Sequence, residues 1–273
     1  MARLSQDEIL EFRKTILDYF LESERKFPWR ETTNPYNILV SEMMLQQTQT
    51  ERVLPKYLEW LTFFPDAETL ASAPLSTVLE HWAGLGYNRR ARFLHESCKK
   101  IVNENDGLFP SDPDTLDSLP GIGPYTARAI STFAFGIPNV FIETNIRSVY
   151  IFFFFSGRTD VSDKEILELI GETLYIENPR VWYYALMDYG ATLKKKVSNP
   201  NRNSLHYAKQ SRFEGSHRQA RGAVIRYLNT YTQATIESIS ETESIPKERV
   251  ESAVHALQTE GIVAEKDGVY RIS

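Results

Sequence analysis

Apolar side chains recur at helical spacing along most of the chain. The first such set is Leu4, Ile9, Phe12, Ile16 and Tyr19. Val161 to Leu174 follows the same pattern, and Ser162 followed by Glu165 is typical of a capping box at a helix start. Short polar joints such as FPDAE, FPSDPD and IENPR separate the segments, and no sustained strand-like alternation occurs before residue 260. The pattern predicts an all-α body of about ten helices with brief connections.

The pattern changes near residue 194. Residues 194–219 are basic, polar and poor in aliphatic side chains, which indicates a surface segment joining two modules. Three short helices are then predicted over 221–231, 234–242 and 246–260, followed by a hairpin of GIVAEK and VYRIS around an Asp-Gly turn. These are the elements of a winged helix-turn-helix, so we predict a winged-helix-like module over 220–273. Its third helix (244–261) has mixed charge, which leaves DNA binding, protein binding and simple packing open.

Composition narrows the class of protein. The chain has 273 residues, 42% hydrophobic and 25% charged, as in globular proteins. Its longest apolar run, Val149 to Phe155, is too short to cross a bilayer, and its charged, helical opening predicts no secretory signal. Cys98 is the only cysteine, which excludes an internal disulfide and an all-cysteine metal site and favours a reducing compartment such as the cytoplasm. The net charge of −5 disfavours nucleic acid weakly, because a local basic patch can override it.

One uncharged stretch, LPGIGPYTA at 119–127, precedes an apolar helix. We expect Gly121 and Gly123 to adopt backbone angles barred to other residues and to admit another molecule closely. Pro124 suits the first turn of a helix, whose free N–H groups and positive dipole end suit a phosphate. The stretch therefore indicates a nucleic-acid phosphate held by backbone donors, with a packed corner between two helices as the alternative.

Four motifs together resemble those of the helix-hairpin-helix DNA glycosylases. They are SEMMLQQTQTERV (41–53), HWAGLGYNRRARFL (81–94), LPGIGPYTARAI (119–130) and ETNIRSV (143–149), in the family's order and spacing. The resemblance runs from about Phe27 to Gly190 and is greatest to the MutY-type adenine glycosylases. It implies a glycosylase domain of two helical subdomains over 1–219, with the hairpin at about 113–135. It also implies a monomer that acts on mismatched or damaged double-stranded DNA and has no membrane contact.

The resemblance assigns chemical roles to four residues. Glu42 matches the carboxyl group that protonates the flipped base, and we expect its apolar neighbours to raise its pKa. Glu143 stands where the family has an aspartate that stabilises the sugar cation, and Asn145 matches an asparagine that supports that carboxylate. Tyr125 occupies the position of the catalytic lysine of the lyase members. A phenol forms no Schiff base, so the resemblance implies a monofunctional glycosylase.

Other matching positions are implied to touch DNA. Gln46 or Gln47 would enter the duplex, and Tyr87 would intercalate beside the orphan base. The full set of implied DNA contacts is Gln46, Gln47, Thr48, Tyr87, Arg89, Arg90, Gly121, Gly123 and Arg128. Trp29 and Arg30 match a motif near the base pocket. A solvated polar face is the alternative for the glutamines, and core packing is the alternative for Tyr87.

The sequence departs from the MutY type at three places. No cysteine follows MDYGATLKKK, where the family binds an iron–sulfur cluster, so we expect no cluster; a monovalent cation at the hairpin remains open. A winged-helix-like module stands where the family has its 8-oxoguanine-recognition domain, and Glu143 replaces aspartate.

From the resemblance as a whole we predict a base excision repair glycosylase for adenine opposite 8-oxoguanine or guanine. The alternatives are a glycosylase for another base and a DNA-structure-binding protein without catalysis.

Overall fold

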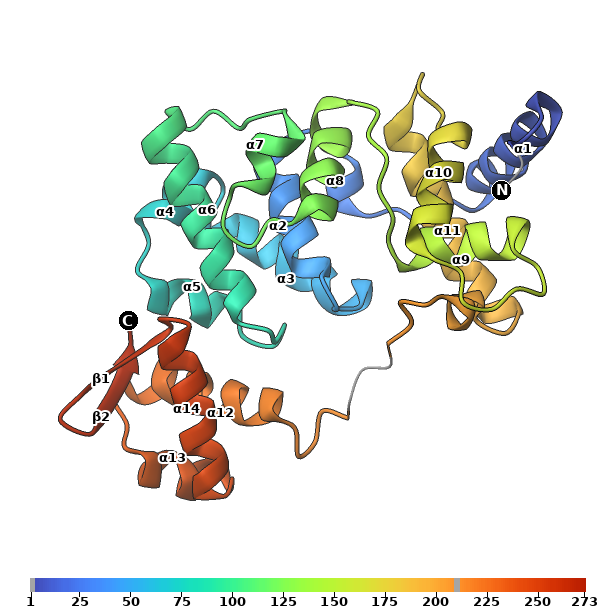
Figure 1. Cartoon of the computed structure of the whole chain (residues 1–273). Helices are drawn as coiled ribbons and strands as arrows, with labels where there is room; N and C mark the ends of the chain where they lie inside the picture. The colour runs from blue at the N-terminus through green and yellow to red at the C-terminus, as the bar shows by residue number, and fades with distance from the viewer. Residues whose placement is uncertain (1–2, 209–211) are drawn as a thin grey trace. The chain divides into compact units, whose positions relative to one another are not determined.

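The computed structural model describes residues 3–208 and 212–273, and these form two compact units (Figure 1). The first unit comprises residues 1–38, 111–117 and 123–209, and the second comprises 39–110, 118–122 and 210–273. Each unit is thus assembled from separate stretches of chain. The predicted boundary at residue 219/220 between a glycosylase domain and a C-terminal module remains a prediction.

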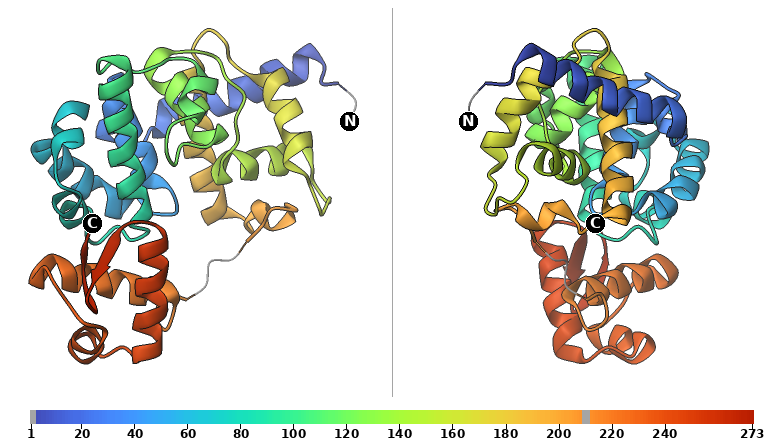
Figure 2. Two further views of the ribbon diagram at one scale, coloured as in Figure 1. Left: turned by 60° about the vertical axis from the view of Figure 1, so that its left-hand side comes forward. Right: turned by 90° about the vertical axis from the view of Figure 1, so that its right-hand side faces the viewer.

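The first unit is helical. Its elements are α1 (Gln6–Ser23), η1 (Pro28–Arg30), α7 (Pro113–Asp117), α8 (Pro124–Phe135), α9 (Thr144–Phe154), α10 (Asp163–Thr173), α11 (Pro179–Lys196) and η2 (Pro200–Asn203). α11 packs against α1 and α9, and Figure 2 shows α1 beside α10 and α11. Phe12 of α1 reaches this core and meets the rings of Tyr150 and Trp182 edge-on. The predicted capping box of α10 is confirmed, because Ser162 and Glu165 each bond the other's backbone N–H.

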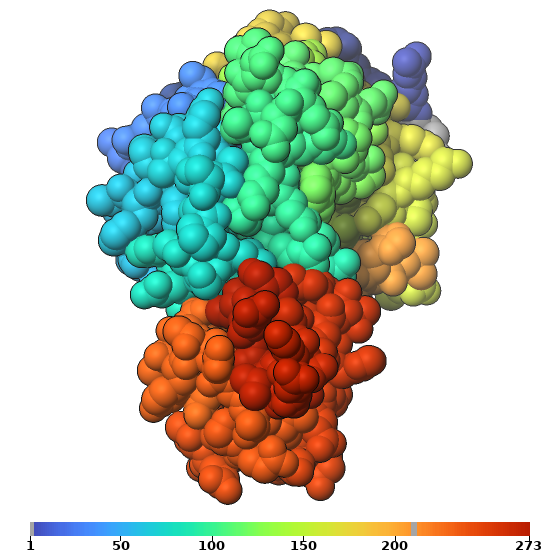
Figure 3. Space-filling view, turned by 90° about the vertical axis from the view of Figure 1, so that its left-hand side faces the viewer, coloured from blue at the N-terminus to red at the C-terminus, as the bar shows by residue number. Residues whose placement is uncertain are grey.

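The second unit contains most of α2 (Pro35–Leu45) and nine further elements. They are α3 (Thr50–Phe63), α4 (Ala67–Ser72), α5 (Leu75–His81), α6 (Arg89–Asn105), α12 (His217–Tyr231), α13 (Ile236–Glu243), α14 (Lys247–Thr259), β1 (Val263–Lys266) and β2 (Val269–Ile272). Trp60 and Trp82 are fully buried and meet edge-on in its core. Figure 3 shows the C-terminal segment of this unit, in orange and red, against the part of the same unit drawn in cyan, and α12 packs on α5. The all-α class is therefore confirmed for the body.

Three helices and a hairpin follow residue 216, in the order expected from the sequence. β1 and β2 pair antiparallel, with Val263 opposite Ile272 and Lys266 opposite Val269. The turn residues Asp267 and Gly268 both have positive φ, as a two-residue type I′ hairpin turn requires. The backbone of Ala234 exchanges two hydrogen bonds with that of Tyr270, which ties the start of α13 to the hairpin.

None of the helices within residues 3–208 and 212–273 is both long and apolar enough to span a membrane.

Candidate functional site

Glu42 lies on α2 among apolar side chains. Glu42 is 8% exposed, and the neighbouring Met43 and Met44 have no exposed surface. The Glu42 carboxyl group is therefore largely shielded from water at this position. Its role as a proton donor remains a prediction.

Arg90, in the first turn of α6, extends its buried side chain to the C-terminal end of α2, where it bonds to backbone carbonyl groups. Its guanidinium donates to the carbonyl oxygens of Met43, Met44 and Gln46 at 2.8, 2.9 and 2.6 Å. It also donates to Thr48 Oγ1 at 3.1 Å and to the carbonyl oxygen of Gly86 at 3.0 Å. Burial lowers the pKa of Arg90 to about 10, which leaves it charged at neutral pH.

Arg90 thereby joins the two loops that carry the polar residues predicted to enter DNA. Gln47 follows α2 and Tyr87 ends the GLGY turn, and both have a left-handed backbone, with φ of 55° and 49°. Non-glycine residues adopt this conformation rarely and at a cost, which surrounding contacts must offset. The buried guanidinium supplies such contacts to both loops.

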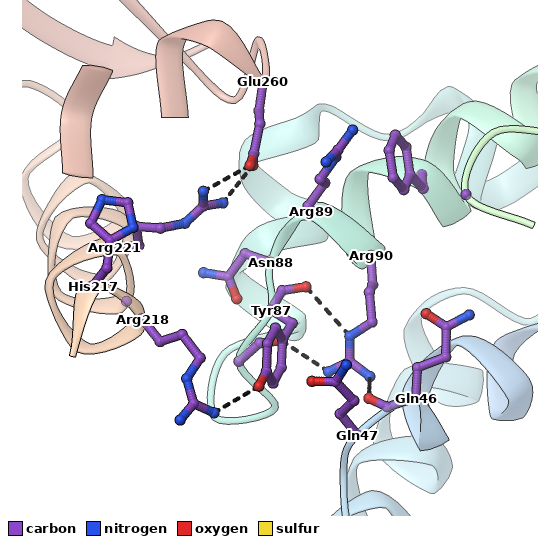
Figure 4. Close-up of a pocket in the computed structure, with 14 residues that line it drawn as sticks. Gln46, Gln47, Tyr87, Asn88, Arg89, Arg90, His217, Arg218, Arg221 and Glu260 are labelled. Atoms are coloured by element: carbon purple, nitrogen blue, oxygen red, sulfur yellow. Dashed lines mark hydrogen bonds and ion pairs between the residues drawn. The ribbon is translucent and has the colours of Figure 1, made fainter. Parts of the chain in front are cut away.

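The structure brings most of the predicted DNA contacts of the second unit onto one cavity. The cavity measures about 390 Å³ (Figure 4). Predicted contact residues on its wall are Gln46, Gln47, Tyr87, Arg89, Arg90 and Gly121. Thr48 lies beside them, where its side chain accepts from Arg90.

The two hairpin glycines have different backbone conformations. The expectation of a backbone angle barred to other residues is correct for Gly121 and wrong for Gly123. Gly121 has φ of +71°, and a Cβ there would lie 2.3 Å from the ring of Phe93, so no larger residue fits. Gly123 has φ of −102° and ψ of 176°, which any residue adopts, and a Cβ would meet nothing within 4 Å. Gly123 is the N-cap residue of α8, so the absence of its side chain leaves the helix N-terminus open to an incoming group.

Glu143 caps the N-terminus of α9 with its own side chain. Its Oε1 accepts from the backbone N–H groups of Asn145 and Ile146 at 2.7 and 2.9 Å. Two N–H donors therefore hold one carboxylate oxygen against the first turn of α9. The longer side chain of glutamate is thus folded back onto its own helix.

Asn145 and Lys194 extend this arrangement within the first unit. The side chain of Asn145 donates to Glu143 Oε2 at 3.3 Å and accepts from Lys194 Nζ at 2.9 Å. Burial lowers the pKa of Lys194, and the nearby Glu143 carboxylate opposes that shift. Gly190 lets α11 approach closely, because a Cβ there would lie 2.3 Å from the carbonyl oxygen of Asn145. The sequence places Lys194 only in a basic segment and predicts no contact with Asn145. The position of Lys194 one helical turn after Gly190 could have indicated that both face the same neighbouring helix.

Tyr125 and Arg128 lie in the first half of α8. The half-buried ring of Tyr125 meets Phe141 edge-on at 5.7 Å, and Phe141 stacks on Tyr183. Arg128 donates to the carbonyl oxygen of Pro124 at 3.1 Å. Aromatic packing fixes the ring of Tyr125, and both predicted roles remain predictions.

Trp29 and Arg30 are buried in the first unit. Trp29 stacks on Phe27, and Arg30 pairs with Asp188 through two bonds of 2.8 and 2.9 Å. The Arg30 guanidinium also lies 4.5 Å from the ring centroid of Tyr184. These contacts give Arg30 a place in the core, and its role near a base pocket remains a prediction.

The cysteine chemistry of the chain does not fit an iron–sulfur cluster. Cys98 is the single cysteine, is fully buried on α6, and has a thiol pKa raised by burial. Such a cluster needs several thiolate ligands. Among the described residues, no group of three or more His, Cys, Asp or Glu side chains is placed to hold a metal ion.

Comparisons with known proteins agree with this architecture. Residues 40–175 match the family model "HhH-GPD superfamily base excision DNA repair protein". An adenine DNA glycosylase of Mycolicibacterium smegmatis is 30% identical over 280 residues, covering 94% of each chain. One of Buchnera aphidicola is 36% identical over 199 residues, covering 71% of this chain and 56% of that protein. The chain thus spans little more than half of the Buchnera relative.

Solved structures give the same fold. A thermostable thymine-DNA glycosylase superposes with a TM-score of 0.61 at 28% identity, covering 68% of this chain and 87% of that one. An endonuclease III trapped in a covalent complex with DNA superposes with a TM-score of 0.58 at 21% identity, covering 67% and 85%. The second similarity is one of fold alone.

Replacing Arg90 by lysine should destabilise the protein. A lysine has three donors on a point charge and cannot reach carbonyl groups on both loops, so buried acceptors lose their partners. Each unsatisfied group costs ~1–3 kcal/mol, so we expect the free energy of unfolding to fall by about 3 kcal/mol. Urea denaturation measures this, with the exposed neighbour Arg89→Lys as control. Equal midpoints for wild type and Arg90→Lys would contradict the assignment.

The two hairpin glycines should respond differently to alanine. Gly121→Ala should lower the melting temperature, because its Cβ meets Phe93 and its φ is strained by ~1–2 kcal/mol. Gly123→Ala should melt like wild type but bind matched and mispaired duplexes more weakly by the same factor. Thermal melting and duplex titration test this. A binding loss confined to one mispair would show that the α8 N-terminus is not a backbone clamp.

Proposed function

Because the chain belongs to the HhH-GPD superfamily of base excision DNA repair proteins, we propose that it is a monofunctional adenine DNA glycosylase. Its substrate is adenine mispaired with 8-oxoguanine or guanine in double-stranded DNA. The observation that carries this proposal is the buried Glu42, which stands in a motif shared with the adenine glycosylases. The enzyme works as a monomer at the DNA, in the reducing cytoplasm.

The reaction breaks the bond between adenine and its sugar. The adenine leaves the base stack and enters a pocket, where Glu42 gives a proton to the ring. Protonation makes the base a neutral leaving group, so the bond breaks toward an oxocarbenium-like sugar. Water completes the hydrolysis.

Glu143 supplies the negative charge that this transition state needs. A carboxylate near the sugar stabilises the developing cation more than the neutral ground state. The N–H groups of α9 hold one oxygen of the carboxylate, and Asn145, held by Lys194, bonds the second. Tyr125 takes the place of the lyase lysine and cannot form an imine with the sugar, so the DNA strand stays intact.

The remaining predicted residues bind DNA. Gln46, Gln47 and Tyr87 fill the space left by the displaced adenine, and Arg89 contacts phosphate. The α8 N-terminus at Gly123 binds a second phosphate, with Arg128 beside it. Arg90 supports the two loops from beneath. The enzyme holds no iron–sulfur cluster, since its lone buried thiol cannot supply the ligands.

The similarity to a thymine-DNA glycosylase favours a second candidate, removal of mismatched thymine. The same carboxylate pair would serve that reaction, because both bases leave from the same sugar carbon. Adenine is preferred because the adenine glycosylase similarity extends over 94% of the chain.

Replacing Glu42 by glutamine should abolish adenine release. The amide is similar in size but has no acidic proton, and loss of a general acid costs ~10²–10⁴-fold in rate. Single-turnover excision from an adenine:8-oxoguanine duplex measures the effect, and duplex affinity should stay nearly unchanged. Glu51→Gln on the exposed start of α3 is the matched control. Excision at the wild-type rate by Glu42→Gln would overturn the assignment.

Variants at Glu143 separate charge from position. Glu143→Gln should lose on the order of 10²-fold in single-turnover rate, because the amide carries no charge. Glu143→Asp should retain substantial activity, reduced only if the shorter chain displaces the carboxylate, since ~1 Å can cost ~10²-fold. Lys194→Met should lower the rate as well, whereas Lys196→Met, exposed on the same helix, should not. Equal rates for wild type and Glu143→Gln would show that this carboxylate has no catalytic charge.

A further inference from the structure

The cavity that carries the predicted DNA contacts is completed by the C-terminal segment of the chain. α12 contributes His217, Arg218, Arg221 and Gly222, and Glu260 follows α14. Figure 4 shows Arg218 pointing to Tyr87, and Arg221 paired with Glu260. All of these residues belong to the second unit. The sequence motifs gave no sign of this contribution, because α12 lies beyond every one of them.

Arg218 binds Tyr87 directly. Its Nη1 donates to the tyrosine hydroxyl at 2.7 Å, and its guanidinium carbon lies 5.3 Å from the ring centroid. A second cavity of about 240 Å³ is lined by Gln47, Gly86, Tyr87 and Arg218 among others, and the main cavity shares these four residues. The Tyr87–Arg218 pair therefore forms a wall common to both cavities. A residue in the left-handed region needs such outside support to keep one orientation.

The main cavity has the size and lining that suit a nucleotide. Its volume of about 390 Å³ falls within the range of small-molecule sites. Tyr87 and Phe93 place aromatic rings on its wall, and arginine side chains lie over both rings. Aromatic rings can stack with a base, and Gln46 and Gln47 offer amide groups that can bond a base edge. Four arginines line the cavity against one carboxylate, Glu260, which pairs with Arg221. The exposed Arg89, 4.7 Å from the Phe93 ring centroid, is placed to meet a phosphate at the rim.

We propose that this cavity binds one nucleotide of the DNA duplex and that Arg218 is the residue that positions Tyr87 as its stacking wall. The base stacks on Tyr87 and its phosphate meets Arg89. The inference rests on the proposed function and extends it, because it makes the C-terminal module part of the surface that recognises the lesion. Arg218 acts through Tyr87 and is a positioning residue.

On this proposal the module meets DNA through α12. For its third helix, predicted at 244–261 and observed as α14, the sequence had left DNA binding, protein binding and packing open. Arg249 of α14 donates to the carbonyl oxygen of Ser216 and to Gln219 at 3.0 and 3.2 Å. Lys247 pairs with Glu237 on α13. These two cations are engaged within the module, whereas Arg218 of α12 lines the cavity.

A double-mutant cycle on duplex affinity tests the proposal. The variants of the full chain are Arg218→Met, Tyr87→Phe and the two combined, with Arg226→Ala as control on the exposed side of the same helix, where it pairs with Glu243. The probes are a duplex with adenine opposite 8-oxoguanine and the fully matched duplex. Base–aromatic stacking is worth ~1–3 kcal/mol, so each single variant should lose about fivefold or more in affinity for the mispaired duplex. The double variant should lose no more than the weaker-binding single one, because one interaction is removed twice.

The salt dependence of duplex binding by two variants distinguishes the proposal from a loss of structure. Arg89→Ala should reduce the slope of log affinity against log salt by about 1, as expected of one phosphate contact, and Arg226→Ala should change nothing. Additive losses in the cycle, or tighter duplex binding by Arg218→Met, would overturn the proposal; the second result would mean that the module blocks the DNA surface. Binding is measured without excision, so wild type that binds but releases no adenine would contradict only the proposed activity.

Discussion

The last carbonyl groups of α2 have no partners inside their own helix, and in this protein one buried guanidinium supplies them. Arg90 bonds to the carbonyls of Met43, Met44 and Gln46, and to that of Gly86 in the neighbouring turn. A positive charge there also complements the negative end of the helix dipole. Glu42 on α2, the glutamines after it and Tyr87, for which we propose roles in catalysis and DNA binding, therefore lie on segments that one side chain holds together. Arg90, which the motif implied as a DNA contact, is thus buried and supports the loops of the other predicted DNA contacts.

The Glu143 carboxylate is held by the N-terminus of its own helix and by Asn145. Glu143 is one methylene longer than the family's aspartate, and it folds back to cap α9, where two N–H groups hold its Oε1. Gly190 allows α11 close to this turn, and Lys194 on α11 holds Asn145 in place against the carboxylate. Lys194 lies just before the segment in which the resemblance to the MutY type implies cluster-binding cysteines. The hydrogen bond from Lys194 to Asn145 connects this end of α11 to α9 without a metal cluster.

Much of the fold followed from sequence pattern, and the fine geometry of the site did not. Apolar spacing predicted the helical body, and the capping residues and the Asp-Gly turn predicted the start of α10 and the final hairpin. Motif order assigned roles to Glu42, Glu143 and the glutamines, and these roles stay predictions. Pattern could not tell that Arg90 is buried while Arg89 is exposed, because both follow Tyr87 and differ only in helix face. Nor could it tell that Gly121 needs a positive φ and Gly123 does not, or that Arg218 reaches Tyr87 from 131 residues away. Such contacts join distant stretches of chain, and local periodicity carries no information about them.

The central claim is that two carboxylates release a mispaired adenine without an imine to the sugar. The most direct measurement incubates the wild-type protein with end-labelled duplexes carrying adenine opposite 8-oxoguanine, guanine or thymine, and thymine opposite guanine. Each sample is then divided, and half is treated with hot alkali to cut at abasic sites. The account predicts cleavage at adenine opposite 8-oxoguanine and guanine, in the alkali-treated half alone. Cleavage at thymine would instead support the second candidate. Strand cleavage without alkali, or no abasic site in any duplex, would contradict the account.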